Sequence, residues 1–229
     1  MWLEPVRLST LSLFKNKKYK EVEKPFRLIA KMWQESLDSL HLSGHSLFKN
    51  KKYRAAEKQF RLAAERRETF LGPRNRDTLR SFFWLGRSLY EQGRYKEAEK
   101  QLREVVEGDR DMLTPNHKDL LNSTHWLGRC LFGQKKYKQA EKEFREAAEG
   151  RITALGPKNR DTLRSFFWLG RSLYEQRKCK EANEHLGRVV KGDKAMLGPD
   201  HEDTLNSIKW LARIKECMQQ QQQQQQRQQ

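Results

Sequence analysis

The 229-residue sequence has few of the features that mark membrane, secreted or disulfide-rich proteins. It has no run of 18 apolar residues, which excludes a membrane-spanning helix. Its first residues lack the apolar stretch and cleavage site of a signal peptide, so we expect no secretion. Its three cysteines, Cys130, Cys179 and Cys217, are odd in number and widely spaced, which argues against a disulfide framework and for a reducing compartment. We therefore expect a water-soluble cytoplasmic protein.

Catalytic and cofactor motifs are also missing. The sequence contains no H-E-x-x-H, G-x-S-x-G or G-x-x-x-x-G-K-[ST] pattern. His41 and His45 are four residues apart in one predicted helix and could hold a metal together, but no third ligand is suggested nearby. His117 and His201 lie in predicted connectors. We predict no enzyme, no metal, no cofactor and no small-molecule substrate.

Charge of one sign predominates. The chain has 47 lysines and arginines against 30 acidic residues, a net charge of +17. Such a balance favours acidic partners, and a solvated lysine-rich surface would produce it as well.

The main positive signal is a repeat of 42 residues. The eighteen residues NRDTLRSFFWLGRSLYEQ stand at 75–92 and again at 159–176, two repeats apart. Columns of glycine, alanine, tryptophan, tyrosine and aspartate keep one register; they include Gly44, Gly86, Gly128 and Gly170, Ala56, Ala98, Ala140 and Ala182, Trp84, Trp126, Trp168 and Trp210, Tyr53, Tyr95 and Tyr137 with Cys179 next, and Asp77, Asp119, Asp161 and Asp203. Self-similarity at this period predicts stacked copies of one small structural unit.

A second duplication shows that the unit exists in a short form. SLFKNKKY occurs at 12–19 and at 46–53, only 34 residues apart. The eight missing residues correspond to the connector FLGPRNRD at 70–77.

Each long unit is predicted to form two helices. In the unit that starts at Asp77, apolar residues at helical spacing predict a first helix over 78–91 with Asp77 as its N-cap. Gly93 suits a turn with positive φ, and a second helix is predicted over 95–112. Gly72, Gly156 and Gly198, each followed by proline, are predicted to end second helices. Gly86 and Ala98 remove side-chain bulk where the two helices approach.

The stretch WLGRSLYEQGRYKEAEKQLREVVEG resembles a tetratricopeptide repeat at Leu85, Gly86, Leu89, Tyr95, Ala98 and Leu102. The 42-residue unit with its LGP-N-DTL connector is similar to kinesin light chains, and more so to fungal tetratricopeptide arrays. The resemblance covers about 35–218 and implies an all-α, right-handed α-solenoid of stacked helix pairs. Kinesin light chains carry an Asn-Asn pair in the first helix, where this chain has Phe83-Trp84 and its counterparts, so their cargo rules do not transfer.

The predicted organisation follows from the repeat register. It comprises a degenerate first helix pair at 1–34, repeats at 35–76, 77–118, 119–160 and 161–202, a capping helix at 203–218 and a disordered glutamine-rich tail at 219–229. Pro25 is expected to kink or break the second helix of the first pair. The alternative for the tail is a short extension of the capping helix.

The resemblance implies that first helices line a concave groove, with three groove-facing positions in each unit. These positions hold Arg80, Phe83 and Arg87; Asn122, His125 and Arg129; Arg164, Phe167 and Arg171; and Asn206, Lys209 and Arg213. The arginine column Arg87, Arg129, Arg171 and Arg213 could bind carboxylates, or it could pair with glutamates of neighbouring helices. The tryptophan column is interpreted as packing between units, with groove anchors as the alternative.

The function predicted from these features is a protein-interaction scaffold. Its partner is expected to be a protein or peptide segment, acidic and with an apolar anchor, and no membrane is involved. The alternative is a basic α-solenoid that binds RNA or another nucleic acid. Against it, the basic residues are interleaved with acidic ones.

Overall fold

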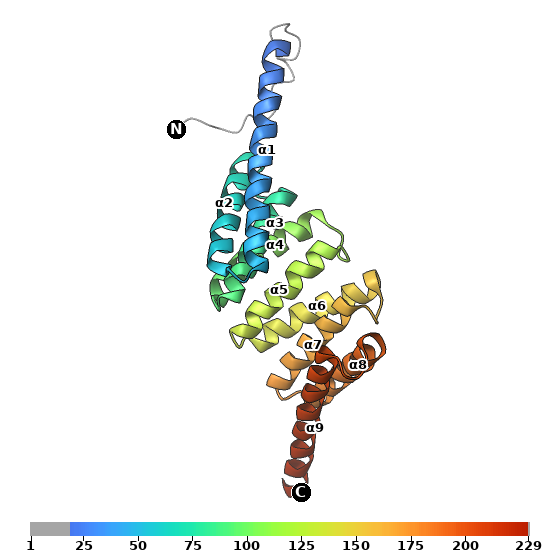
Figure 1. Ribbon diagram of the computed structural model, residues 1–229. Coiled ribbons are helices and arrows are strands. Elements are labelled where there is room, and N and C mark those ends of the chain that lie inside the picture. The colour runs from blue at the N-terminus through green and yellow to red at the C-terminus, as the bar shows by residue number, and fades with distance from the viewer. Residues whose placement is uncertain (1–18, 229) are drawn as a thin grey trace. The chain divides into compact units, whose positions relative to one another are not determined.

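The computed structural model describes residues 19–228, which form nine α-helices and no strand (Figure 1). The chain divides into two compact units, residues 1–92 and 93–229. The first unit contains α1 (Tyr19–Lys49), α2 (Tyr53–Leu71) and α3 (Arg76–Glu91). The second contains α4 (Tyr95–Met112), α5 (Lys118–Gly133), α6 (Tyr137–Leu155), α7 (Arg160–Glu175), α8 (Cys179–Leu197) and α9 (Glu202–Gln228). The predicted all-α fold is confirmed.

Within each unit, consecutive helices pack as antiparallel neighbours. In the first unit α2 packs against both α1 and α3, and in the second each helix from α4 to α9 packs against the next. Among the first helices, α5 also contacts α7, and α7 contacts α9. The stacked first helices thus form one surface of the second unit, and these helices carry the predicted groove positions between Asn122 and Arg213.

The alanine and glycine columns allow this close packing. Ala98, Ala140 and Ala182 are fully buried. A Cβ atom at Gly170 would overlap Cδ2 of Leu186, and one at Gly128 would lie 2.8 Å from the Phe144 ring. Because contacts below about 3 Å force a neighbour to move, no side chain fits at these positions without repacking.

The helix ends are set by residues of the connectors. Gly72, Gly156 and Gly198 follow α2, α6 and α8 with φ of 86–89°, as the glycine-proline signal predicts. Asp77 is not the N-cap of α3. The Asn75 side chain accepts the hydrogen bond from the backbone N–H of Asp77, which lies in the first turn. His117 and His201 occupy the same position and accept from Asp119 and Asp203, so these connector histidines have a capping role that the sequence analysis missed.

Helix α1 corrects the prediction for the N-terminal region. It runs unbroken from Tyr19 to Lys49, through the position of Pro25 and across the expected boundary between residues 34 and 35. Its N-terminal half extends beyond α2 (Figure 1). The expected first helix of the degenerate pair falls in residues 1–18, outside the described residues. The eight-residue connector that reverses the chain between α2 and α3 is missing here. The second helix of one repeat and the first helix of the next are therefore joined into the single helix α1.

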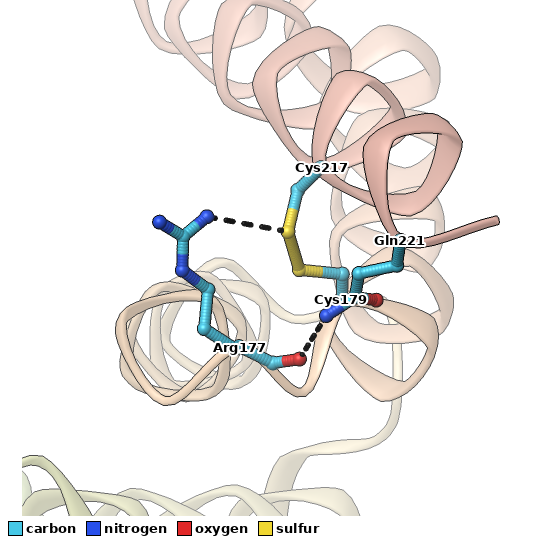
Figure 2. The surroundings of a disulfide bond; sticks show 4 residues. All are labelled: Arg177, Cys179, Cys217 and Gln221. Carbon is cyan, nitrogen blue, oxygen red and sulfur yellow. Dashed lines mark hydrogen bonds between the residues drawn. A yellow bond between two sulfur atoms is a disulfide. The ribbon is translucent and has the colours of Figure 1, made fainter. Parts of the chain in front are cut away.

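Helix α9 corrects the prediction of a disordered tail. The capping helix does not end at residue 218, because the glutamine run continues it to Gln228. One glutamine is also held by the array: Gln221 Nε2 donates a 2.8 Å hydrogen bond to the carbonyl oxygen of Arg177 (Figure 2). The alternative of an extended capping helix is the correct one.

A disulfide bond joins Cys179, the first residue of α8, to Cys217 in α9 (Figure 2). This bond contradicts the interpretation of both cysteines as unpaired, and it removes the basis for inferring a reducing compartment. The third cysteine, Cys130, is buried and free, and burial raises the pKa of its thiol. Cys179 and Cys217 lie two repeats after Tyr95 and Gly133, and the structure places Tyr95 against position 133 as it places Cys179 against Cys217.

None of the helices described is long and apolar enough to cross a membrane.

Candidate functional site

The arginine column stacks on the tryptophan column. In the second unit the Arg129 guanidinium carbon lies 4.3 Å from the Trp126 ring centroid and 4.8 Å from that of Trp168. Arg171 lies 4.7 Å from Trp168 and 4.2 Å from Trp210. Each of these arginines is therefore held between tryptophans of two successive first helices, a contact that neither sequence-based alternative named.

The other two arginines of the column each stack on one tryptophan. Arg213 lies 4.9 Å from the Trp210 ring centroid, and in the first unit Arg87 lies 4.4 Å from that of Trp84. His45 heads the column, and its ring lies 4.1 Å from that of Trp84. A cation over an indole ring contributes about 0.5–1 kcal/mol when exposed and about 2 kcal/mol when desolvated. The stacking holds each guanidinium plane in a fixed orientation on this surface.

The tryptophans pack between helix pairs, as predicted. Trp84 stacks on Phe60 of α2 with 5.9 Å between centroids, and Trp168 stacks on Phe144 of α6 at 6.0 Å. Because each ring fills the space against the preceding second helix on one side and carries an arginine on another, the column is structural and only half-buried.

A pocket of about 220 Å³ opens between α7 and α9. Its apolar lining comes from Leu163, Phe167, Trp168, Val189 and Leu197, and its polar lining from Arg160, Arg164, Asp193, Asp203, Asn206 and Ser207. Three predicted groove residues, Arg164, Phe167 and Asn206, thus line one cavity. Lys209 and Arg213 are exposed on the same helix, α9, but do not line it.

The charges in this pocket are of both signs. Arg160 binds Asp203 at 2.9 Å, and Arg164 lies 3.6 Å from Asp161. Both pairs are about half-exposed, so each contributes little to stability and can exchange partners. Asp193 is buried and accepts a 2.7 Å hydrogen bond from Ser207. Burial raises the pKa of Asp193, and the Ser207 bond opposes that shift.

Asp193 lines the pocket with a short side chain. At the same repeat position Arg151 is buried and extends to Ser165 Oγ at 2.7 Å and to Asn122 Oδ1 at 2.6 Å. Asp193 reaches only the equivalent serine, Ser207, and leaves unfilled the space that a guanidinium occupies one pair earlier. The 42-residue spacing of these buried charged residues was visible in the sequence, but it did not reveal that one side chain fills a space and the other leaves it open.

His125 is not part of the predicted groove. Its side chain is only 2% exposed, its ring packs on Phe144, and its Nδ1 lies 3.3 Å from Ser165 Oγ. Its position faces the core because the imidazole is small enough to share that space with the Phe144 ring. Asn122 is half-buried and bonded to Arg151, which occupies its side-chain oxygen.

The remaining predicted site residues lie on accessible surface of their own units. Arg80 is exposed, and Phe83 is half-buried beside Trp84 with 5.7 Å between ring centroids. They belong to the first unit, whereas the pocket belongs to the second.

The pair His41 and His45 is held in an aromatic cluster. Their Nε2 atoms are 3.1 Å apart, and both rings pack edge-on against Phe60. Burial, with His45 and Arg67 nearby, lowers the pKa of His41 to about 3. Among the described residues no group of three histidine, cysteine or carboxylate side chains is placed to hold a metal ion.

The tetratricopeptide repeat family matches the chain over residues 35–111 and 119–195. The chain belongs to the tetratricopeptide repeat family. No curated protein matches the chain. Among solved structures, this tetratricopeptide array is similar to a putative kinesin light chain of Podospora anserina with nearly identical repeats, with TM-score 0.71, 24% identity, and coverage of 83% of this chain and 90% of that one. A single-substitution form of the same fungal protein gives TM-score 0.72 at the same identity and coverage.

Two more distant structures share the fold. BtubC (BKLC) from P. vanneervenii matches with TM-score 0.71 and 14% identity over 85% of this chain and 79% of that one. The apo form of RapI matches with TM-score 0.69 and 13% identity over 80% and 64%. The expected likeness to kinesin-light-chain-like arrays is confirmed. The tetratricopeptide fold serves as a protein-interaction scaffold.

Proposed function

We propose that this tetratricopeptide array binds an acidic peptide segment with one apolar anchor residue, and that the anchor enters the pocket between α7 and α9. The observation that carries the proposal is the composition of that pocket, where Leu163, Phe167 and Trp168 lie beside two half-exposed arginines. Its volume of about 220 Å³ is suited to one side chain rather than to a free cofactor.

The acidic character of the partner is supported by the charge around the pocket. Arg164 and Arg160 form only solvent-exposed pairs, so an incoming carboxylate can join or replace Asp161 and Asp203 at low cost. Lys209 and Arg213 add positive charge further along α9. An acidic residue on either side of the anchor would therefore find a guanidinium or ammonium group, and arginine can bind a carboxylate with two parallel hydrogen bonds.

The test is affinity for a library of acidic peptides that carry one aromatic or aliphatic residue. Arg164→Glu should weaken binding at least tenfold, since it places a like charge against the peptide. Phe167→Ala should weaken binding at low and at high salt, because burial of an apolar anchor is not screened. Lys180→Glu, an exposed charge reversal on α8 away from the pocket, is the matched control and should leave affinity unchanged.

Arg129 and Arg171 are poorer test positions. Glutamate at either would break the stacking on two tryptophans, so a loss of binding could reflect loss of local structure. A mixed RNA pool is the comparison ligand. Nucleic acid binding would fall log-linearly with salt and would respond as strongly to Lys180→Glu as to Arg164→Glu. That result, with no response of any acidic peptide to Arg164→Glu, would overturn the proposal.

A further inference from the structure

Helix α1 consists of two repeat helices joined end to end. The repeated SLFKNKKY places Tyr19, which begins α1, in the position of Tyr53, which begins α2. The stretch from Tyr53 to the end of α3 is longer than α1 by the eight residues of the missing connector. Residues of α1 up to Glu35 therefore correspond to a second helix such as α2, and residues from Ser36 onward to a first helix such as α3.

In the other repeats a second helix and the first helix that follows it are antiparallel, and a buried polar contact links them. One residue before the connector bonds to a serine after it, at distances of 2.7–2.8 Å: Arg67 to Ser81, Asp109 to Ser123, Arg151 to Ser165, and Asp193 to Ser207. All eight side chains are at most 7% exposed. This contact is a constant feature of the junction between a second helix and the next first helix.

In α1 the corresponding residues are Trp33 and Ser39, and both reach the surface. Trp33 is 45% exposed, although its ring centroid lies 5.1 Å from that of Phe70, and Ser39 is exposed. They lie six residues apart on one continuous helix, about 9 Å along its axis and on different faces, so they cannot contact each other. Among residues 19–228, therefore, neither side chain is buried against the partner that it has in the other repeats.

We propose that a second copy of this chain covers this surface, with the α1 helices of the two copies packed antiparallel about a two-fold axis near residues 35 and 36. Trp33 of each copy then lies against Ser39 of the other. The two contacts are identical, as a two-fold interface requires. Loss of a connector that would let a chain fold back on itself favours this kind of exchange between copies.

The residues along α1 suit such a pairing. Met32, Ser36, Ser39, Ser43 and Ser46 follow the alternating spacing of three and four residues that forms one stripe on a helix, and all are exposed. Met32 is 60% exposed, and Trp33 lies beside this stripe. In an antiparallel pair Trp33 of one helix would face Ser39 of the other, and the small serine side chains allow close approach of two helices.

The decisive experiment restores the missing connector. We expect the full chain to have twice its monomer mass of 27.3 kDa in solution by light scattering. Insertion of Phe-Leu-Gly-Pro-Arg-Asn-Arg-Asp after Glu35 should let the two halves of α1 fold on each other and yield a monomer of unchanged helical content. The same eight residues added after Gln229 are the control and should leave the dimer intact. A monomeric unmodified chain at tens of micromolar, or an insertion variant that stays dimeric, would overturn the proposal.

Two further variants test the interface without a change of fold. Trp33→Lys should weaken the dimer at least tenfold. Lys31→Glu should not, because Lys31 is exposed, lies about 160° around the helix from Trp33 and falls outside the stripe. The double variant Trp33→Cys with Ser39→Cys should form a covalent dimer on oxidation, and each single variant should not. Equal effects of Trp33→Lys and Lys31→Glu would show that the interface lies elsewhere.

Discussion

At the scale of single residues, one column of buried charged side chains controls the space between helix pairs. Arg67 and Arg151 fill that space with a guanidinium group and bond to a serine and a backbone carbonyl of the next helix. Asp193 bonds to a serine alone and leaves the pocket. Filling the pocket would therefore require only one longer side chain, and Asp193→Arg should remove peptide binding if the pocket is the binding site.

Two glycines on neighbouring helices should respond oppositely to alanine. Gly170→Ala places a Cβ atom against Cδ2 of the fully buried Leu186 and should cost about 1–3 kcal/mol, more than the gain in helix propensity. Gly187 has no atom within 4 Å of its Cβ position, so Gly187→Ala should stabilise α8 by up to about 1 kcal/mol. Urea unfolding of the two variants measures both effects. Equal shifts of the same sign would show that α7 and α8 are not in close contact at Gly170.

His41 should make the first unit sensitive to acid. Burial lowers the pKa of His41 to about 3, well below the unfolded value of 6.5, so the folded state resists protonation. The contribution is fully present above about pH 6.5 and is lost as the pH falls from 6.5 towards 3, by up to about 1.4 kcal/mol per pH unit. His41→Phe, the residue found at the equivalent positions 83 and 167, should reduce this dependence. Thermal unfolding at pH 7.5 and pH 5.5 compares the two proteins, and parallel shifts would exclude His41 as the cause.

At the scale of helices, local signals determine most of the fold. Apolar spacing, glycine-proline connectors and small-residue columns were sufficient to predict α4 and to place the other paired helices within a few residues. They failed at the two ends for physical reasons. Pro25 predicts a break in the helix, yet α1 continues through it because the connector that would reverse the chain is missing. The composition of the glutamine run predicts disorder, yet the run follows directly from a stable helix and glutamine is a good helix former.

The site was predicted less well than the helices. Position along the repeat assigns Arg164, Phe167 and Asn206 to one face, and all three line the pocket, but it also assigns the buried His125 to that face. Whether a residue near the edge of a helix face points to the core depends on its size and on the residue opposite, here Phe144. The stacking of arginines on tryptophans likewise depends on two neighbouring helices, which one sequence register does not reveal.

Two deletions at the end of α9 should distinguish the glutamines that contact the array from those that do not. Deletion of residues 222–229 removes only exposed glutamines and an exposed arginine among the side chains that are described, and it should leave the melting temperature unchanged. Deletion of residues 219–229 also removes the Gln221 bond to Arg177 and should cost about 0.5–1.5 kcal/mol. Circular dichroism should show less helix in both variants. An unchanged helical signal would mean that the run is not helical in solution.

At the scale of the whole molecule, each helix pair should be stabilised by its contacts with the neighbouring pairs rather than by one common core. The Cys179–Cys217 bond ties the terminal helix to this series of pairs, and a disulfide typically contributes about 2–4 kcal/mol. Reduction should speed hydrogen exchange in α8 and α9 first and leave α4 and α5 unaffected, because each helix pair contacts only its neighbours. The variant with serine at both positions should show the fast exchange without reductant. Uniform acceleration across the chain would indicate a single cooperative unit.

The same bond determines how the array would carry a mechanical load. A pull on the C-terminal end of α9 passes through Cys217 directly to the start of α8, so the stretch of chain between the two cysteines bears no tension while the bond is intact. The 38-residue separation corresponds to roughly 130 Å of extended chain at about 3.5 Å per residue. Stretching of single molecules by their two ends should therefore release about that much less length under oxidising conditions than after reduction. A protein attached through its C-terminus would keep its last helix pair folded under a force that unravels the rest.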